Sequence, residues 1–169
     1  MKLLIVCVES NKNAKTDAAY IEKAIKEYYV INNDVKLSFI FMNSKSEYRK
    51  QKYAKEIEQL RNYVGKDNTR VLFCVDTDNY DTSSEDQKLN DEIQKYCNDK
   101  DYSFVWFCKC IEEVFLHTKV SSHNKVSESK KFGAADGLKF ATKENLSSKS
   151  MSQYKSNILL EIGNFINHK

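Results

Sequence analysis

Glycine is scarce in this sequence and proline is absent, with four glycines and no proline among 169 residues. Neither the G-x-G-x-x-G pattern of dinucleotide-binding folds nor the G-x-x-x-x-G-K-[S/T] pattern of P-loop proteins occurs. Both patterns use glycine because the backbone must approach a phosphate closely. Their absence argues against a dinucleotide-dependent oxidoreductase and against a P-loop ATPase.

Long apolar runs are also lacking. Runs such as Leu3 to Val8 fall far short of the roughly 18 residues that a membrane-spanning helix needs. Met1-Lys2 leads straight into this run without a small-residue cleavage site, so we expect no signal peptide. The sequence therefore predicts a cytoplasmic protein with no membrane partner.

The five cysteines show no zinc-ribbon spacing, and three of them lie inside apolar runs, where a thiol packs as a small hydrophobe. A metal site at Cys108 and Cys110 is the alternative, because these two would share a face if residues 102–110 formed a strand. No second ligand pair accompanies them, so we expect core thiols in a reducing cytoplasm. The five are Cys7, Cys74, Cys97, Cys108 and Cys110.

The composition is that of a globular chain, with 41% hydrophobic and 30% charged residues. Its length predicts one domain over residues 1–169, with a core at 1–110 and a helical and loop-rich part at 111–169. The net charge of +3 is small, but the charges are unevenly distributed.

An acidic segment lies between two basic ones. Residues 76–101 carry nine acids against three lysines. Residues 45–70 and 119–155 each carry eight Lys or Arg residues, against four and three acids respectively. This distribution suits a polyanion, DNA or RNA, that passes an acidic site. The alternative is that the charges lie on solvated helix faces.

The stretch from Val71 to Asp81 combines a buried strand with acids. Its first five residues, Val-Leu-Phe-Cys-Val, are typical of a strand buried on both faces. Asp76 and Asp78 follow where this strand would leave the sheet, with side chains on the same side and about 7 Å apart. Carboxylates held side by side favour a hard cation such as Mg²⁺ or Mn²⁺. The alternative is an Asp-rich turn that satisfies local backbone donors.

Strands and amphipathic helices alternate along the chain. Strands are predicted over residues 3–10, 35–42, 70–76 and 102–108. This order predicts an α/β fold, a Rossmann-like sandwich with a mainly parallel four-stranded sheet flanked by helices. In such folds ligands bind beyond the carboxyl ends of the strands. Glu9 follows the first strand, so it would converge with Asp76 and Asp78 if the first and third strands are neighbours.

Helices are predicted from apolar periodicity and capping residues. Three start signals are the pairs Ser44 and Glu47, Ser83 and Asp86, and Ser150 and Gln153. The expected helices cover residues 15–30, Ser44 to Gly65, Ser83 past Cys97, 111–117, a short piece around 127–142, and 151–165.

A Glu after the first strand and an Asp-x-Asp after the third form the acid layout of the TOPRIM domain, which occurs in topoisomerases, primases and several nucleases. Within that group the chain resembles the RloB-like family of bacterial defence-associated proteins. Glu9 is followed by Lys15-Thr16-Asp17 and Tyr20, similar to the family's Glu-Gly, Lys-Thr-Glu and Tyr. Asp76-Thr77-Asp78 matches its acid pair.

The resemblance extends to the middle and the end of the chain. Cys110-Ile111-Glu112 through Leu116-His117 resembles the family's Asn-Pro-x-Phe-Glu…Leu-His segment, without the Asn-Pro and with a shorter spacing. The last predicted helix, preceded by Asn145-Leu-Ser-Ser, resembles its C-terminal end.

This resemblance implies a TOPRIM-like fold and phosphodiester chemistry that depends on Mg²⁺ or Mn²⁺. Asp76 and Asp78 would hold the cation together with Glu9, which would also serve as general acid or base. Glu112 would be a supporting acid. The alternative for Glu112 and its neighbour Glu113 is a solvated helix face, and for His117 it is a packed or capping residue.

Three functions are compatible with these features. The first is a metal-dependent nuclease of a bacterial defence or restriction-linked system. The second is a non-catalytic binding or regulatory subunit of a defence complex, acting with a partner protein or as a homo-oligomer. It is favoured by Ser10 in place of the family's glycine and by about three extra residues before Lys15. The third is a receiver domain phosphorylated on Asp76, for which Glu9-Ser10 supplies only one of two required acids.

Overall fold

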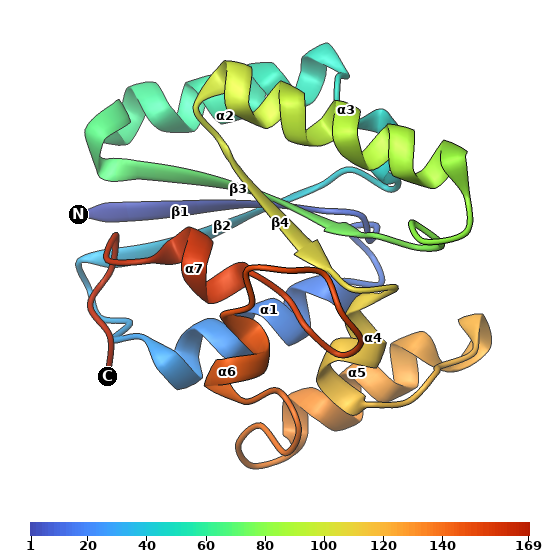
Figure 1. Cartoon of the computed structure of the whole chain (residues 1–169). Coiled ribbons are helices and arrows are strands. Elements are labelled where there is room, and N and C mark those ends of the chain that lie inside the picture. Colours follow the sequence, from blue (N-terminus) through green and yellow to red (C-terminus); the bar gives the residue numbers. More distant parts are fainter.

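The four predicted strands form one sheet in the computed structural model, which describes residues 1–169. The strand order is β2-β1-β3-β4, and every neighbouring pair is parallel (Figure 1). The strands are β1 (Lys2–Val8), β2 (Val35–Phe41), β3 (Thr69–Asp76) and β4 (Ser103–Phe107). The predicted α/β class and parallel sheet are confirmed. Because all strands run the same way, their carboxyl ends lie along one edge.

Helices cover both faces of this sheet (Figure 1). On one face lie α2 (Gln51–Val64) and α3 (Ser84–Lys100). The other face is covered by α1 (Thr16–Tyr28), α4 (Ile111–Leu116), α5 (Lys125–Ala134), α6 (Lys143–Leu146) and α7 (Ile158–Ile162). Short 3₁₀ turns span Lys45–Glu47, Lys66–Asn68 and Ser122–Asn124. No helix is both long enough and apolar enough to cross a membrane.

The central strand β1 contributes to a core on each face. Leu4, Val6 and Val8 join a cluster of 22 buried residues beneath α1, whereas Leu3 and Ile5 join a cluster of 17 beneath α2 and α3. Alternate side chains of a strand point to opposite faces, so a continuous apolar run fits a strand covered on both sides. Each fully buried Leu, Ile or Val stabilises the fold by about 1.5–3 kcal/mol. The sheet is thereby a rigid support for the residues that follow each strand.

Cysteines take part in this packing. Four of the five are buried and the fifth, Cys110, is half-buried. All five are free thiols. The strand that would have aligned Cys108 with Cys110 ends at Phe107, so that shared face does not form.

Capping residues explain where α3 begins and where α2 ends. Ser83 Oγ accepts the Asp86 backbone N–H at 3.2 Å, which confirms the predicted start of α3. Gly65 ends α2 with φ of 97°, a conformation that glycine adopts without a Cβ clash. Ser44, in contrast, caps only a 3₁₀ turn, and α2 begins later, at Gln51.

The short helix expected around 127–142 is present as α5, which begins at Lys125 and ends at Ala134. The final helix, in contrast, is much shorter than predicted. The helix expected over 151–165 is reduced to Ile158–Ile162, because the preceding residues pair with the open edge of β4 instead. Ser156 forms an antiparallel bridge with Phe107, and the Lys155 carbonyl accepts the Cys108 N–H at 3.0 Å. These hydrogen bonds to the sheet outweigh the local apolar periodicity.

Asn157 completes the cover over this edge. Its side-chain oxygen accepts the Trp106 backbone N–H at 2.9 Å, and its side-chain nitrogen donates to the Phe104 carbonyl at 2.9 Å. Asn157 is only 7% exposed, so the two backbone groups have no access to solvent as a substitute.

We expect Asn157→Ala to lower the free energy of unfolding by about 2 kcal/mol or more, because it leaves a buried donor and a buried acceptor unpaired. Urea unfolding of both proteins measures the difference. The exposed Asn98 in α3 provides a control, and Asn98→Ala should change stability by no more than about 0.5 kcal/mol. Equal effects of the two substitutions would contradict the bridging role.

Candidate functional site

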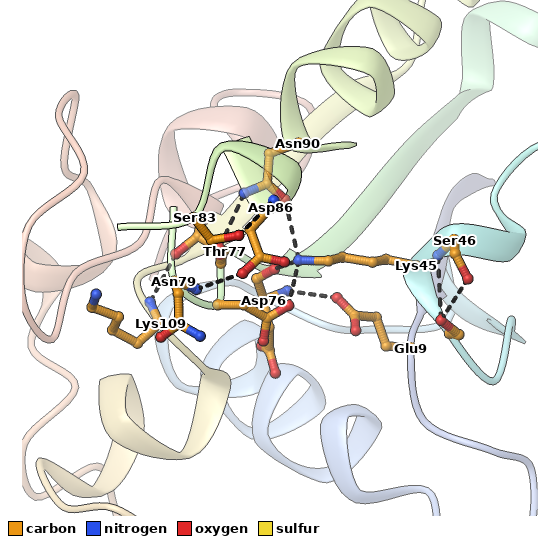
Figure 2. A network of polar contacts seen from close by, with 12 residues as sticks. Glu9, Lys45, Ser46, Asp76, Thr77, Asn79, Ser83, Asp86, Asn90 and Lys109 are labelled. Atoms are coloured by element: carbon orange, nitrogen blue, oxygen red, sulfur yellow. Dashed lines mark hydrogen bonds and ion pairs between the residues drawn. The ribbon is translucent and has the colours of Figure 1, made fainter. Parts of the chain in front are cut away.

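Glu9 and Asp76 meet at the carboxyl edge of the sheet. Glu9 directly follows β1 and Asp76 ends β3, and these strands are neighbours in the sheet, as the sequence required for convergence. The Asp76 backbone N–H donates to Glu9 Oε1 at 2.7 Å (Figure 2). Two acids that are 67 positions apart are therefore in direct contact.

The Asp76 carboxylate connects β3 to α4. Its Oδ1 accepts the backbone N–H of Ile111, the first residue of α4, at 2.9 Å. This bond satisfies one of the amides that a helix start leaves free. The next residue of α4, Glu112, is thereby brought to the same edge of the sheet.

Glu112 is completely buried. The solvated helix face considered as its alternative is therefore wrong. Lys125 Nζ, from α5, lies 3.2 Å from Glu112 Oε1 and 3.3 Å from Oε2, but only the contact to Oε2 has hydrogen-bond geometry. Glu112 Oε1 is a buried carboxylate oxygen without a hydrogen-bond partner. Such an atom is costly unless a further cation or donor approaches it.

Asp17 joins these acids from the first turn of α1. Its Oδ2 accepts the Ser10 backbone N–H at 3.0 Å, and its Oδ1 accepts the Thr16 hydroxyl at 3.1 Å. These bonds hold the loop after β1 against the start of α1. We refer to Glu9, Asp17, Asp76 and Glu112 as the acid cluster.

Burial and mutual repulsion raise the pKa values of Glu9, Asp17 and Asp76. Burial raises the pKa of Glu9 to about 8, against the opposing effects of its hydrogen bond from Asp76 and of Lys45. Burial, followed by the charge on Glu9, raises the pKa of Asp76 well above its usual value. The pKa of Asp17 is raised by burial and by the charge on Glu112. Too little positive charge therefore lies near Glu9, Asp17 and Asp76 to stabilise all three carboxylates in their ionised form.

Asp78 lies near the acid cluster but is paired elsewhere. Its Oδ2 is 2.5 Å from Lys45 Nζ, and its side chain is 45% exposed. Its backbone has φ of 51°, in the left-handed region that Asp tolerates better than most residues. The structure thus brings Glu9, Asp76 and Glu112 together and directs Asp78 to a lysine.

The donor atoms of the acid cluster suit a hard divalent cation, because they are carboxylate oxygens and one of them, Glu112 Oε1, accepts no hydrogen bond. The arrangement is nevertheless no closed coordination sphere. No group of three or more His, Cys, Asp or Glu side chains is placed so that it could hold a metal ion in common. Lys45 and Lys125 already hold Asp78 and Glu112. The predicted metal set of Glu9, Asp76 and Asp78 stays a prediction.

A cavity of about 500 Å³ opens beside Asp78. It lies between the turn after β3 and the turn after β4, and its lining includes Tyr80, Lys109 and Lys119. The cavity thus adjoins the carboxyl edge, where ligands of parallel α/β folds bind.

His117 has no part in the acid cluster. Its ring is stacked between Phe140, at a centroid distance of 5.0 Å, and Tyr154, at 4.3 Å. This is the packed residue considered as the alternative from the sequence.

Three residues of the site were not among the predicted site residues. Asp17 had a usable signal, because an acid in the first turn of the helix after β1 must lie at the carboxyl edge. Lys45 and Lys125 had no such signal in the sequence, because their long side chains reach residues of neighbouring elements. Most lysines of a globular protein are solvated, so a lysine in the sequence does not by itself indicate a site.

The raised pKa of Glu9 makes stability depend on pH. The unfolded chain releases this proton near the ordinary value of 4.5, whereas the folded chain keeps it up to about pH 8. Between these values the unfolded state binds fewer protons, so the free energy of unfolding falls as pH rises. In EDTA we expect Glu9→Gln, which cannot ionise, to gain stability relative to wild type between about pH 5 and pH 8.

Urea unfolding across this pH range measures the difference. Glu27 is an exposed residue of α1, and Glu27→Gln should run parallel to wild type. A constant difference between Glu9→Gln and wild type at all pH values would show that Glu9 has no raised pKa.

Known proteins add no evidence about identity. No model of a protein family, no curated protein and no solved structure matches this chain. The resemblance to TOPRIM proteins of the RloB-like family thus rests on the residues named above and stays a hypothesis. The site is defined by its own geometry.

Proposed function

We propose that this chain is a divalent-cation-dependent nucleic-acid phosphodiesterase whose reaction centre is the acid cluster. One observation carries the proposal. Four carboxylates, from α1, β3, α4 and the residue after β1, gather at the carboxyl edge of the sheet, and a buried oxygen of Glu112 accepts no hydrogen bond and has only Lys125 as an ion-pair partner. Such a gathering of acids, with Glu112 completely buried and the other three half-buried, does not stabilise a fold, because each desolvated charge opposes folding.

A Mg²⁺ or Mn²⁺ ion at the acid cluster would be held by one or two carboxylates, Asp76 among them, with water and the substrate phosphate as its other ligands, because no three of these side chains are placed to hold a metal ion in common. A bound cation would offset the charge on a phosphate and on its transition state. The residues of the chain supply the framework: the Asp76 N–H orients Glu9, and the Ile111 N–H orients Asp76. Lys125, with a side chain that is 39% exposed, is close enough to the surface to contact a phosphate as well.

Cationic side chains surround the acid cluster on the same edge. Besides the buried Lys45, which is paired with Asp78, the loops that follow β1, β2 and β4 carry five Lys or Arg residues: Lys12, Lys15, Arg49, Lys50 and Lys109. A negatively charged backbone is attracted to such a rim, and the attraction weakens with salt.

A non-catalytic nucleic-acid-binding module is the second candidate, and Lys45 favours it. Its ammonium contacts the Asp76 carbonyl at 2.6 Å and Asp78 at 2.5 Å, so part of the acidic edge is neutralised without any metal. This candidate predicts that the chain binds DNA or RNA equally well in EDTA and never cleaves it.

Incubation with fluorescent single-stranded DNA, duplex DNA and RNA, in Mg²⁺, Mn²⁺ or EDTA, tests both candidates. The proposal expects cleavage with a divalent cation and none in EDTA. Asp76→Asn should lower the rate at least about 100-fold, equivalent to about 2.7 kcal/mol of transition-state stabilisation. Asp91→Asn, at an exposed position of α3, should leave the rate unchanged.

The outcomes separate the candidates. Cleavage that survives EDTA or Asp76→Asn would rule out the acid cluster as the reaction centre. Binding to any of the three substrates, without cleavage under any of the metal conditions, would favour the non-catalytic module.

A further inference from the structure

Lys45 is a buried lysine with three acceptors. It lies in the 3₁₀ turn after β2 and is only 5% exposed. Its Nζ donates to the Asp76 carbonyl at 2.6 Å and to Asn90 Oδ1 at 3.2 Å (Figure 2). It also forms an ion pair with Asp78 Oδ2 at 2.5 Å. An ammonium group has three protons and accepts none, so these contacts use its full capacity.

Asn90 and the residues after β4 hold the same turn from the other side. The Asn90 side-chain nitrogen donates to the Thr77 carbonyl at 3.1 Å, which fixes the direction of its oxygen toward Lys45. Thr77 N–H donates to the Phe107 carbonyl at 3.0 Å, and Thr77 Oγ1 accepts the Lys109 N–H at 2.8 Å. Thr77 is completely buried. The turn of residues 76–78 is therefore fixed by partners on β4, α3 and the turn after β2.

The charge on Lys45 requires Asp78. A buried ammonium is destabilising unless an opposite charge accompanies it, and Asp78 is the carboxylate that lies against Lys45. Asp78 in turn cannot direct the same oxygen toward the acid cluster while it pairs with Lys45. Asp76 and Asp78, two positions apart in the sequence, thus have different partners: the Asp78 carboxylate pairs with Lys45, whereas the Asp76 carboxylate accepts the Ile111 N–H.

We propose that Lys45 is a positioning residue, a built-in cation that fixes the turn of residues 76–78 and keeps Asp78 outside the set that binds a divalent cation. The second half of this inference rests on the proposed function, because it concerns cation binding by the acid cluster. The first half, the pairing of Lys45 with Asp78, does not.

A double-mutant cycle in EDTA tests the pairing without any metal. Lys45→Met and Asp78→Asn should each lower the urea midpoint, and the double variant should lower it no further than Lys45→Met alone. Lys55→Met, at an exposed position of α2, should leave the midpoint unchanged. Lys45→Gln replaces Lys45→Met if the latter does not fold. Additive effects of the two substitutions would overturn the pairing.

Binding of Mn²⁺ in the absence of nucleic acid tests whether Asp78 lies outside the set that binds a divalent cation. The electron paramagnetic resonance signal of the free ion measures this binding. Asp78→Asn should keep the Mn²⁺ affinity within about threefold of wild type, whereas Asp76→Asn should weaken it at least about tenfold. Lys45→Arg keeps the charge and should match wild type within the same margin. An equal loss in Asp78→Asn and Asp76→Asn would overturn the assignment of Asp78.

The two measurements also separate this inference from the proposed function. If wild type binds no Mn²⁺, the proposed function fails and so does the second half, while the cycle in EDTA still decides whether Lys45 and Asp78 are paired. If Mn²⁺ binds but no nucleic acid is cleaved, the proposed phosphodiesterase reaction is wrong. The cycle in EDTA and the Mn²⁺ affinities of the variants then still decide both halves of the inference.

Discussion

The hydrogen bond from the Asp76 backbone to the Glu9 carboxylate is the contact on which the site depends. It exists because β1 and β3 are neighbours and parallel, so that the residues leaving both strands emerge at the same edge. Asp76 is then held from a second side by the start of α4, which carries the buried Glu112. A change in strand order or direction would separate these residues, and the acid cluster would not form. Parallel pairing is thus both the constraint on the fold and the origin of the site.

The two hydrophobic cores provide stability that offsets the free-energy cost of the acid cluster. The acid cluster lies on the side of the sheet covered by α1, α4 and α5, over a core of 22 buried residues. Desolvated carboxylates oppose folding by several kcal/mol each when they stay charged, and the raised pKa values of Glu9 and Asp76 are the sign of that cost. A stable sheet supported from both faces can tolerate such strain at one edge.

The sheet and its carboxyl edge followed from the sequence, because they depend on local patterns. Apolar runs of five to eight residues separated by amphipathic segments were enough to predict four parallel strands, and chain order then placed Glu9 and Asp76 at one edge. The final helix was mispredicted because its first residues are used to cover the edge of β4, a partner that periodicity cannot reveal. Lys45 and Lys125 were missed for a related reason: a long side chain that crosses between elements leaves no periodic signal.

The positions of these two lysines decide where negative charge remains. Lys45 pairs with Asp78, and Lys125 pairs with Glu112, so one ammonium is assigned to each of two carboxylates. Glu9, Asp17 and Asp76 have no such partner and accept hydrogen bonds from backbone or hydroxyl donors instead, and burial raises the pKa of each of these three carboxyl groups. Protons or a cation must supply the missing positive charge at these three residues. In the proposed function a divalent cation supplies this charge near neutral pH, because one ion replaces several protons that solvent would otherwise remove. Lys45 and Lys125 thus neutralise Asp78 and Glu112, and the deficit of positive charge remains at Glu9, Asp17 and Asp76.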